Sequence, residues 1–286
     1  MKLIRFGEAG REKPGVELPD GTRLDVSDYI NDYTPDFFAY GGMEKLKSVA
    51  NAKLCPAIKG TPRLGPPCAR PNQFIAIGLN YRKHAEEMGA KIPTEPEIFV
   101  KLTSSICGPN DDILIPPSST KMDYEVEIAF VMKNKLRYLD DKKKAMEHVA
   151  GFLICNDVSE RDFQHRGSQW VKGKSHQNFG PLGPWIVPTE ELPDMHNLEL
   201  SLKVNGQTRQ SSNTNDLIFD LNHIVWYCSH FFTLEPGDVI TTGTPSGVAG
   251  GMKPPGFLKA GDQVETTIAK LGTQRNKVVQ AVGAKM

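Results

Sequence analysis

The chain has 286 residues, a length that suits one large domain with a small appendage. Its 34 lysine and arginine residues balance 34 aspartate and glutamate residues, so the net charge provides no attraction to nucleic acid or an anionic membrane. No apolar run reaches the ~20 residues of a membrane-spanning helix, and the first residues do not resemble a signal peptide. Five scattered cysteines without a Cys-x-x-Cys pair favour a reduced, cytoplasmic protein over a disulfide scaffold or a zinc ribbon.

The first 71 residues have the pattern of a small α/β module followed by a linker. Short strands are predicted at Lys2–Phe6 and Gly15–Leu18, and a helix near Met43–Ala50. Residues 56–71 hold five prolines and two glycines, which is typical of a linker. The predicted organisation is a small N-terminal module, a proline-rich linker and a main domain, at residues 1–55, 56–71 and 72–286.

The rest of the chain is rich in predicted strands and poor in predicted helices. Helices are expected at Tyr81–Met88 and Asp140–His148, with Asp140 as the N-cap of the second. Asn205-Gly206 predicts a tight hairpin, and Gly-Asp pairs precede two later strands. Such an order favours an α+β fold on a mixed, rolled sheet. The main strands are expected at Asn72–Gly78, Pro96–Leu102, Tyr124–Met132, Val149–Cys155 and Leu198–Val204.

Two glutamates on one predicted strand form the first candidate site. Side chains alternate across a strand, so Glu125 and Glu127 share one face, while the apolar residues between and around them share the other. Two like charges so close repel each other unless a cation lies between them. A divalent metal site and a solvated strand face are both compatible with this segment alone.

Asp157 directly follows the apolar strand Val149–Cys155 and is the second candidate. A carboxylate at the end of a buried strand is well placed for a site, although Asp157 or Ser159 can instead cap the next helix. Added to the two glutamates, it would complete an all-oxygen set of ligands. Such a set favours Mg²⁺, Mn²⁺ or Ca²⁺ over zinc.

The helix predicted at Tyr81–Met88 carries a His–Glu pair. Asn80 is a candidate N-cap and Gly89 a candidate end of this helix. His84 and Glu87 are three residues apart and therefore share a helix face. A carboxylate beside an imidazole raises its basicity, as a general base requires, whereas the alternative is an ordinary exposed pair.

Lys174 and the segment Thr241–Gly251 are further candidates. Gly173-Lys174-Ser175 suggests a phosphate-binding loop, but that motif needs four residues between its glycines, and Gly167 and Gly173 have five between them. A nucleotide loop is therefore excluded. A desolvated lysine can stabilise an oxyanion, and the amides and hydroxyls of the later segment can bind a carboxylate. An ordinary loop lysine and a plain strand-ending loop are the alternatives.

Taken together and in this order, five motifs resemble the fumarylacetoacetate hydrolase family. The resemblance covers about residues 72–270 and implies a mixed β-roll or β-barrel core, a homodimer, and Mg²⁺ or Mn²⁺ as cofactor. The stretch from Trp170 to Trp185 is similar to a branch that contains 2,4-diketo-3-deoxy sugar-acid hydrolases and proteins labelled ureidoglycolate lyase. The motifs are Gly-x-Asn-Tyr-x-x-His-x-x-Glu (78–87), Asp-Tyr-Glu-Val-Glu (123–127), Asn-Asp-Val-Ser-x-Arg-Asp-x-Gln (156–164), Lys-Ser (174–175) and Thr-Gly-Thr-Pro-x-Gly-Val (242–248).

The resemblance also implies a role for individual residues, position by position. Metal ligands would be Glu125, Glu127 and Asp157. The water-activating pair would be His84 and Glu87, on a helix that often belongs to a lid, and the active-site lysine would be Lys174. Positions that contact substrate correspond to Tyr81, Gln164 and Thr244.

The implied activity is hydrolysis of a C–C bond in a 2,4-diketo acid, an acylpyruvate or a deoxy sugar acid, to pyruvate and a second acid. The alternatives are an oxaloacetate-type decarboxylase or isomerase, a ureidoglycolate lyase, and a carboxylate-binding protein without catalysis. One departure alters the polarity near Lys174: many members have Phe-Asp-x-Phe after Lys-Ser, whereas this chain has His176-Gln177-Asn178-Phe179. Gln164, Gln177 and Asn178 would then suit a polar substrate tail.

Overall fold

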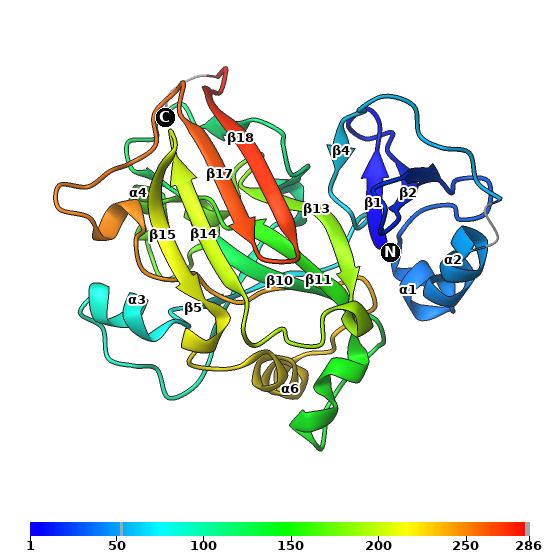
Figure 1. Cartoon of the computed structure of the whole chain (residues 1–286). Helices are drawn as coiled ribbons and strands as arrows, with labels where there is room; N and C mark the ends of the chain where they lie inside the picture. Colours follow the sequence, from blue (N-terminus) through cyan, green and yellow to red (C-terminus); the bar gives the residue numbers. More distant parts are fainter. Residues whose placement is uncertain (52–53, 284–286) are drawn as a thin grey trace.

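The computed structural model describes residues 1–51 and 54–283, which form three β-sheets with few helices (Figure 1). In the 11-stranded sheet, β4 (Leu64–Gly65) pairs with β1 and β7 (Ile106–Cys107) pairs with β13. The other nine strands lie in the spatial order β3 (Arg23–Asp25), β2 (Lys13–Glu17), β1 (Lys2–Phe6), β13 (Gly180–Pro188), β11 (Val149–Asn156), β10 (Val126–Met132), β16 (Val239–Thr241), β5 (Phe74–Gly78) and β6 (Glu97–Lys101).

The second sheet has five strands in the order β15 (Gln207–Asn213), β14 (Glu199–Val204), β17 (Gln263–Ile268), β18 (Gly272–Gln280) and β8 (Ile113–Ile115). The third pairs β12 (Ser159–Glu160) with β9 (Met122–Asp123). Parallel pairs, such as β5 with β16, occur among mostly antiparallel ones. The predicted strand-rich α+β fold with a mixed sheet is confirmed.

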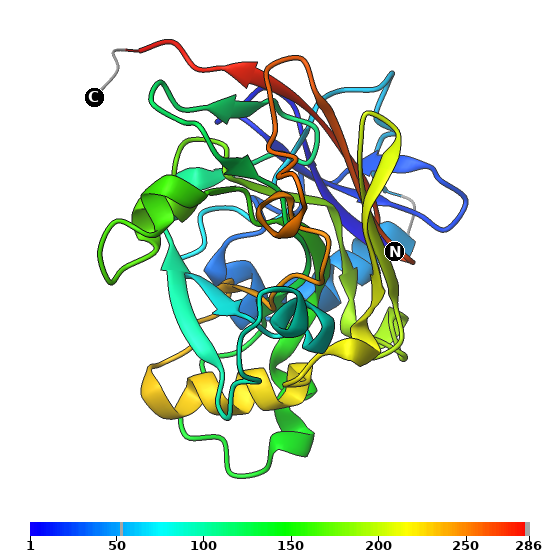
Figure 2. The same cartoon turned by 90° about the vertical axis from the view of Figure 1, so that its left-hand side faces the viewer.

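The helices are short and lie around the sheets. Figure 2 shows α6 at the end of the molecule opposite β18. The α-helices are α1 (Pro35–Ala39), α2 (Gly42–Asn51), α3 (Arg82–Glu87), α4 (Arg161–Gln164), α5 (Val171–Lys174) and α6 (Leu221–Phe231). The 3₁₀ helices are η1 (Thr103–Ser105), η2 (Lys142–His148), η3 (Thr189–Glu191), η4 (Thr214–Asp216) and η5 (Ala249–Gly251). Within the described residues, none of the helices is long and apolar enough to cross a membrane.

Strand β10 is buried on both faces, which explains why its start can hold a buried site. Val126, Ile128 and Phe130 belong to one hydrophobic cluster, and Ala129 and Val131 belong to another. The predicted alternation is therefore real. The regular strand begins at Val126 and not at Tyr124. The reason is that Glu125 N donates to the Asn156 side chain, Oδ1, at 3.0 Å and not to a backbone carbonyl of the neighbouring strand.

Local sequence patterns predicted the Asn205-Gly206 turn correctly, but they predicted two helix N-caps incorrectly. Asn205 and Gly206 have φ values of 51° and 76°, as the predicted hairpin turn requires. The segment predicted as a helix at 140–148 is the 3₁₀ helix η2, and its N-cap is Asp141, whose carboxylate accepts from Lys143 N at 2.9 Å. Asp140 is one residue too early to reach that amide, so its predicted capping role is wrong.

Asn80 also does not cap α3, whose N-cap is Tyr81. The Asn80 amide group instead donates to Thr242 O at 2.8 Å and Phe219 O at 3.1 Å, and accepts from Phe219 N at 2.8 Å. This side chain therefore ties the end of β5 to two distant loops. The reason is tertiary: its partners lie 139 and 162 residues away.

The N-terminal strands continue the large sheet. β1 pairs with β13 at Leu3 and Ile186, and β4, from the proline-rich segment, pairs with β1 (Figure 1). The division into module, linker and main domain stays a prediction. All five cysteines are buried and unpaired, as expected for reduced thiols.

Candidate functional site

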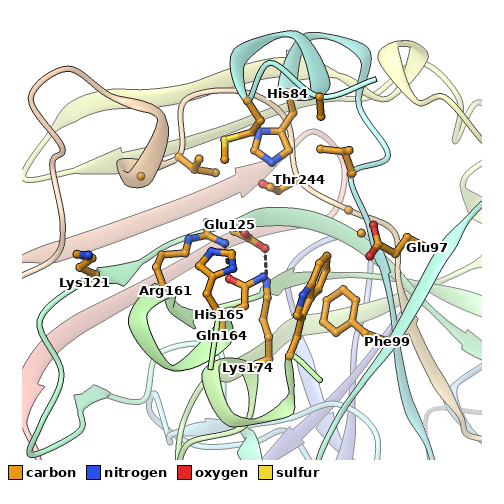
Figure 3. Close-up of a pocket in the computed structure, with 18 of the residues that line it drawn as sticks. His84, Glu97, Phe99, Lys121, Glu125, Arg161, Gln164, His165, Lys174 and Thr244 are labelled. Carbon is orange, nitrogen blue, oxygen red and sulfur yellow. Dashed lines mark hydrogen bonds and ion pairs between the residues drawn. The ribbon is translucent and has the colours of Figure 1, made fainter. Parts of the chain in front are cut away.

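A cavity of about 600 Å³ lies where the start of β10, the end of β5, α3, α4 and α5 meet. Figure 3 shows its residues, with His84 and Thr244 on one side and Lys174 on the other. Among the residues predicted from the sequence, those that line it are His84, Glu125, Glu127, Gln164, Lys174 and Thr244.

The three predicted metal ligands lie together. Glu125, Glu127 and Asp157 each place a carboxylate oxygen within 4.8 Å of the others. Their exposed fractions are 5%, 1% and 0%, which excludes the solvated strand face. Asp157 N donates to Glu125 O at 2.9 Å, so the pairing of β10 with β11 continues past Val126 and brings the aspartate opposite the glutamates.

Three buried cations surround these carboxylates. Lys174 Nζ donates to Glu125 Oε2 and to Asp157 Oδ2, each at 2.7 Å. Arg161 Nη2 lies 2.7 Å from Glu125 Oε1, and Lys101 Nζ lies 2.7 Å from Asp157 Oδ1. Both contacts are ion pairs at the same distance as those of Lys174.

The charges of the two glutamates are stabilised unequally. Burial raises the pKa of Glu127 well above its usual range, and the nearby Asp157 and Glu125 raise it further. Burial would also raise the pKa of Glu125, but Lys174 and Arg161 outweigh it and hold that pKa at about 2. Glu127 accepts only from neutral donors, Thr241 Oγ1 at 2.5 Å and Gly243 N at 2.9 Å.

The residues present fit a divalent cation. Three carboxylates supply hard oxygen donors that lie within 4.8 Å of one another, and burial together with the nearby Asp157 and Glu125 raises the pKa of Glu127. The Lys174 ammonium already bridges two of the carboxylates, which shows that this position favours positive charge. Burial lowers the pKa of Lys174, but Asp157 and Glu125 outweigh it and the net shift is upward.

His84 lies at the cavity wall opposite Lys174 (Figure 3), and it forms a pair with Glu87 of the same helix. His84 Nδ1 lies 3.1 Å from Glu87 Oε2, and Glu87 Oε1 accepts from Gly247 N at 2.9 Å. A carboxylate can only accept, so the proton of the neutral ring is on Nδ1 and the Nε2 lone pair is left for a proton. Glu87 itself does not line the cavity.

The three predicted substrate contacts differ in their surroundings. Thr244 Oγ1 donates to Val126 O at 3.0 Å and accepts from Gln210 Nε2 at 2.8 Å, while Gln164 Oε1 accepts from Arg161 at 3.0 Å. Tyr81 is fully buried in the core beside the cavity and does not line it. Its hydroxyl has no hydrogen-bond partner, and burial raises its pKa.

The polar tail site expected from Gln177 and Asn178 is wrong, because neither residue lines the cavity. Asn178 Nδ2 donates to Asp112 O at 2.8 Å, which directs it away. His176 packs between Phe163 and Phe179 with ring centroids 5.4 and 5.0 Å away. Burial lowers the pKa of His176, and the departure from the family pattern places its imidazole between two phenylalanine rings.

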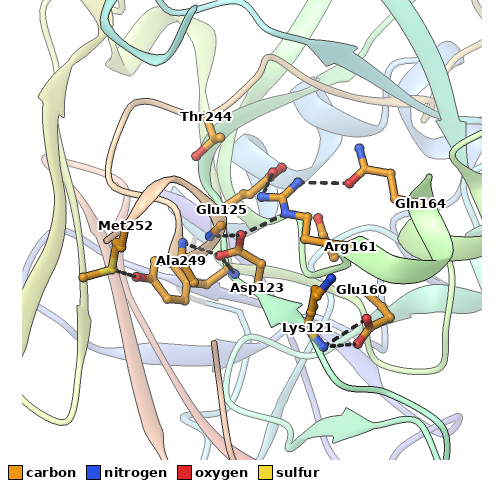
Figure 4. A network of polar contacts seen from close by, with 12 residues as sticks. Lys121, Asp123, Glu125, Glu160, Arg161, Gln164, Thr244, Ala249 and Met252 are labelled. Atoms are coloured by element: carbon orange, nitrogen blue, oxygen red, sulfur yellow. Dashed lines mark hydrogen bonds and ion pairs between the residues drawn. The ribbon is translucent and has the colours of Figure 1, made fainter. Parts of the chain in front are cut away.

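Sequence reasoning missed Arg161 and Lys101. Figure 4 shows Arg161 between Asp123, Glu125 and Gln164, and its Nε donates to Asp123 Oδ2 at 2.9 Å. Asp123 also accepts from Ala249 N at 2.7 Å, so the ion pair of Arg161 with Asp123 holds the distant segment around Ala249 against the site. Arg161 belongs to the motif at residues 156–164, and that motif could have identified it as a site residue. No sequence pattern around Lys101 indicates that it lies at the site.

Comparison with known proteins relates the chain to a single family. The family description "Fumarylacetoacetate (FAA) hydrolase C-terminal" matches residues 73–279. A Burkholderia multivorans protein, named as a hydrolase with no substrate given, is 46% identical over 276 residues, covering 96% of this chain and 97% of that protein.

Solved structures of three enzymes have the same fold. Fumarylacetoacetate hydrolase from Exiguobacterium antarcticum is 34% identical, with a TM-score of 0.84 over 98% of this chain and 100% of that one. Maleylpyruvate hydrolase from Sphingobium sp. SYK-6, in complex with manganese(II) and pyruvate, is 26% identical, with a TM-score of 0.82 over 99% and 100%. 5-Carboxymethyl-2-hydroxymuconate delta-isomerase from Mycobacterium smegmatis is 33% identical, with a TM-score of 0.75 over 99% and 100%.

The match covers most of the chain, and its boundaries agree with the start of β5 and the end of β18. Both hydrolases and an isomerase share this fold, so the fold identifies a class of enzyme and not a substrate. The chain belongs to the fumarylacetoacetate hydrolase family.

Proposed function

We propose that this enzyme is a divalent-metal-dependent hydrolase that cleaves a C–C bond of a 2,4-diketo acid, giving pyruvate and a second acid. The observation that carries the proposal is the pairing of two parts at one cavity: a buried cluster of three carboxylates, two of which line the cavity, and, facing them, a histidine held by its own carboxylate. The cluster alone would suffice for decarboxylation. A base is needed when water must be activated.

Glu125, Glu127 and Asp157 would hold the ion, Mg²⁺ or Mn²⁺, which supplies a Lewis acid for the oxygens of the keto acid. The manganese(II) and pyruvate bound to maleylpyruvate hydrolase support both a divalent ion and this product class. The partner of the site is therefore a small keto acid.

His84 would begin the reaction by taking a proton from water on Nε2, with Nδ1 held by Glu87. The water oxygen attacks the acyl carbonyl, and the bond between that carbon and the CH₂ group breaks. The electron pair of the broken bond passes to the pyruvate enolate, which takes up a proton at carbon. The net change is acylpyruvate plus water to pyruvate, a carboxylate and one proton.

Lys174 and Gln164 would position the substrate. Lys174 lines the cavity beside the carboxylate cluster and can stabilise the oxyanion that forms on the attacked carbonyl. Gln164, whose oxygen is held by Arg161, keeps its amide N–H groups for a carbonyl or carboxylate. Thr244 lines the cavity beside them.

The test is turnover of acetylpyruvate and oxaloacetate by the purified protein with Mg²⁺ or Mn²⁺. We expect acetate and pyruvate from acetylpyruvate, and a loss of about 10²–10⁴ in rate for His84→Ala with Mn²⁺ affinity retained. Glu86→Ala, on the exposed side of α3, is the control. Release of CO₂ from oxaloacetate without any cleavage of acetylpyruvate would overturn the proposal, as would a His84→Ala variant with the wild-type rate.

A further inference from the structure

One wall of the cavity is aromatic and extends outward from the carboxylate cluster. On β6, Glu97, Phe99 and Lys101 alternate along one face, about 7 Å apart from one to the next. Lys101, 2% exposed, lies at the base against Asp157. The Phe99 ring centroid is 5.2 Å from Lys174 Nζ. The aromatic wall therefore begins directly beside the position where the keto acid would bind.

Trp170 extends this wall. Its ring centroid is 5.0 Å from that of Phe99, with the two planes tilted by 59°. The indole rests on Gly78, where an added Cβ would be only 2.8 Å from Trp170 Cζ3. Gly78 pairs with Glu97 across β5 and β6, so a glycine on the neighbouring strand makes room for the indole. Two adjacent rings then offer a broad apolar surface to a flat group.

The lysine and arginine side chains around the cavity do not provide for a second carboxylate on the substrate. Among the described lining residues, every lysine and arginine already pairs with an acidic side chain: Lys121 with Asp162 at 2.8 Å, and Arg161 and Lys174 with the site carboxylates. Glu97 adds a negative charge beyond Phe99. No basic side chain in residues 1–51 and 54–283 lies within ion-pair distance of the Glu97 carboxylate. An acidic tail along this wall would meet repulsion.

We infer that the acyl group of the substrate is neutral and planar, as in an aroylpyruvate, and that Phe99 and Trp170 bind it while Glu97 rejects acidic tails. This inference rests on the proposed function and narrows its substrate class. A hydroxylated sugar chain would leave the two rings without a flat partner. A dicarboxylic substrate would place its second charge near Glu97.

The experiment compares kcat/KM of the Mn²⁺-loaded enzyme for benzoylpyruvate, acetylpyruvate, fumarylpyruvate and a 2,4-dioxo acid with a hydroxylated tail. Benzoylpyruvate is expected to be the best substrate. Trp170→Ala should lower the benzoylpyruvate-to-acetylpyruvate ratio about tenfold or more, and Trp170→Phe, which keeps a ring over Gly78, should restore part of it. Glu97→Gln should raise kcat/KM for fumarylpyruvate several-fold relative to benzoylpyruvate.

Phe231→Ala, an exposed aromatic on α6 outside the cavity, is the matched control and should leave both ratios unchanged. If the wild type prefers fumarylpyruvate or the hydroxylated acid, the inference fails while the proposed function stands. It also fails if Trp170→Ala, shown to be folded by its melting curve, lowers kcat/KM equally for all the substrates. If no acylpyruvate is cleaved, the proposed function fails, and the inference fails with it.

Discussion

Glu127 is the carboxylate in the site whose charge is least compensated. Its pKa is raised by burial and by the nearby Asp157 and Glu125, and only neutral donors contact it. A cation placed among the three carboxylates would relieve this repulsion. The residue therefore has more to contribute to metal binding than to the stability of the protein.

We expect Glu127→Gln to weaken Mn²⁺ binding tenfold or more, measured by calorimetry, because one anionic ligand is lost. The metal-free variant should melt at the wild-type temperature or above it, since the amide oxygen can still accept from Thr241 and Gly243 without the repulsion. Glu86→Gln serves as the exposed control. Unchanged Mn²⁺ affinity would remove Glu127 from the ligand set.

Lys174 occupies the space between two of the same carboxylates, so its ammonium and a metal ion should compete. Lys174→Met should bind Mn²⁺ more tightly than the wild type. Its metal-free form should be less stable by about 3–5 kcal/mol, because Glu125 and Asp157 each lose one of their two cationic partners. Lys172→Met, an exposed neighbour on α5, is the control. Weaker Mn²⁺ binding by Lys174→Met would mean that the lysine helps to hold the ion.

At the scale of elements, polar contacts join α3 to neighbouring loops. Glu87 Oε1 accepts from Gly247 N, Lys83 N donates to Asp216 Oδ2 at 3.3 Å, and Tyr81 forms a bridge with Leu217. The resemblance implies that this helix belongs to a lid that becomes ordered with ligand. That mobility stays a prediction.

Glu87→Ala should therefore speed amide hydrogen exchange in residues 82–90 and leave exchange in β10 and β11 unchanged. The contact with Gly247 is lost, whereas the strands keep their ladders. Glu86→Ala removes a carboxylate from the same helix without this contact and should match the wild type. Equal protection of residues 82–90 in both variants would show that the contact does not hold the helix.

At the scale of the whole molecule, Arg63 links the first 71 residues to the rest. Its guanidinium donates to Asp111 Oδ1 at 2.6 Å and Oδ2 at 2.5 Å, and to Glu12 Oε1 at 2.9 Å. The hydrogen bonds to Asp111 raise the pKa of Arg63, burial lowers it, and Glu12 adds to the upward net shift. The Arg63 and Asp111 side chains are 29% and 19% exposed, so solvent screens the link partly.

Arg63→Met should lower the free energy of unfolding by about 2 kcal/mol, measured by urea titration, since two carboxylates lose their partner. The Lys13 side chain is 60% exposed and pairs with Asp25 at 3.8 Å, so Lys13→Met should change the free energy of unfolding little. An equal effect of both substitutions would mean that the Arg63 link adds no stability between these parts.

The homodimer implied by the family resemblance is also a property of the whole molecule. It stays a prediction, and sedimentation equilibrium of the purified protein should give twice the mass of one chain. A mass of one chain at micromolar concentration would contradict it.

The sequence by itself determined the features that depend on local periodicity. The alternation that directs Glu125 and Glu127 to one side, the spacing of His84 and Glu87, and the Asn205-Gly206 turn all involve residues close in the chain. The backbone geometry of a strand, helix or turn determines how such neighbouring side chains are directed, whatever the position of the segment in the fold. For the same reason the positions of the main strands along the chain were largely predictable, and the ordered motifs identified the family.

Only the tertiary structure decided which neighbours those residues meet. From its own segment, Asp157 was more readily interpreted as a helix cap, whereas the pairing of β10 with β11 brings it beside the glutamates. Lys101 is 56 residues before Asp157 in the sequence and joins it only because β6 lies on the sheet edge near α5. Gln177 and Asn178 follow Lys174 closely, yet they do not line the cavity. Contacts between distant segments depend on sheet register and packing, which no local pattern encodes.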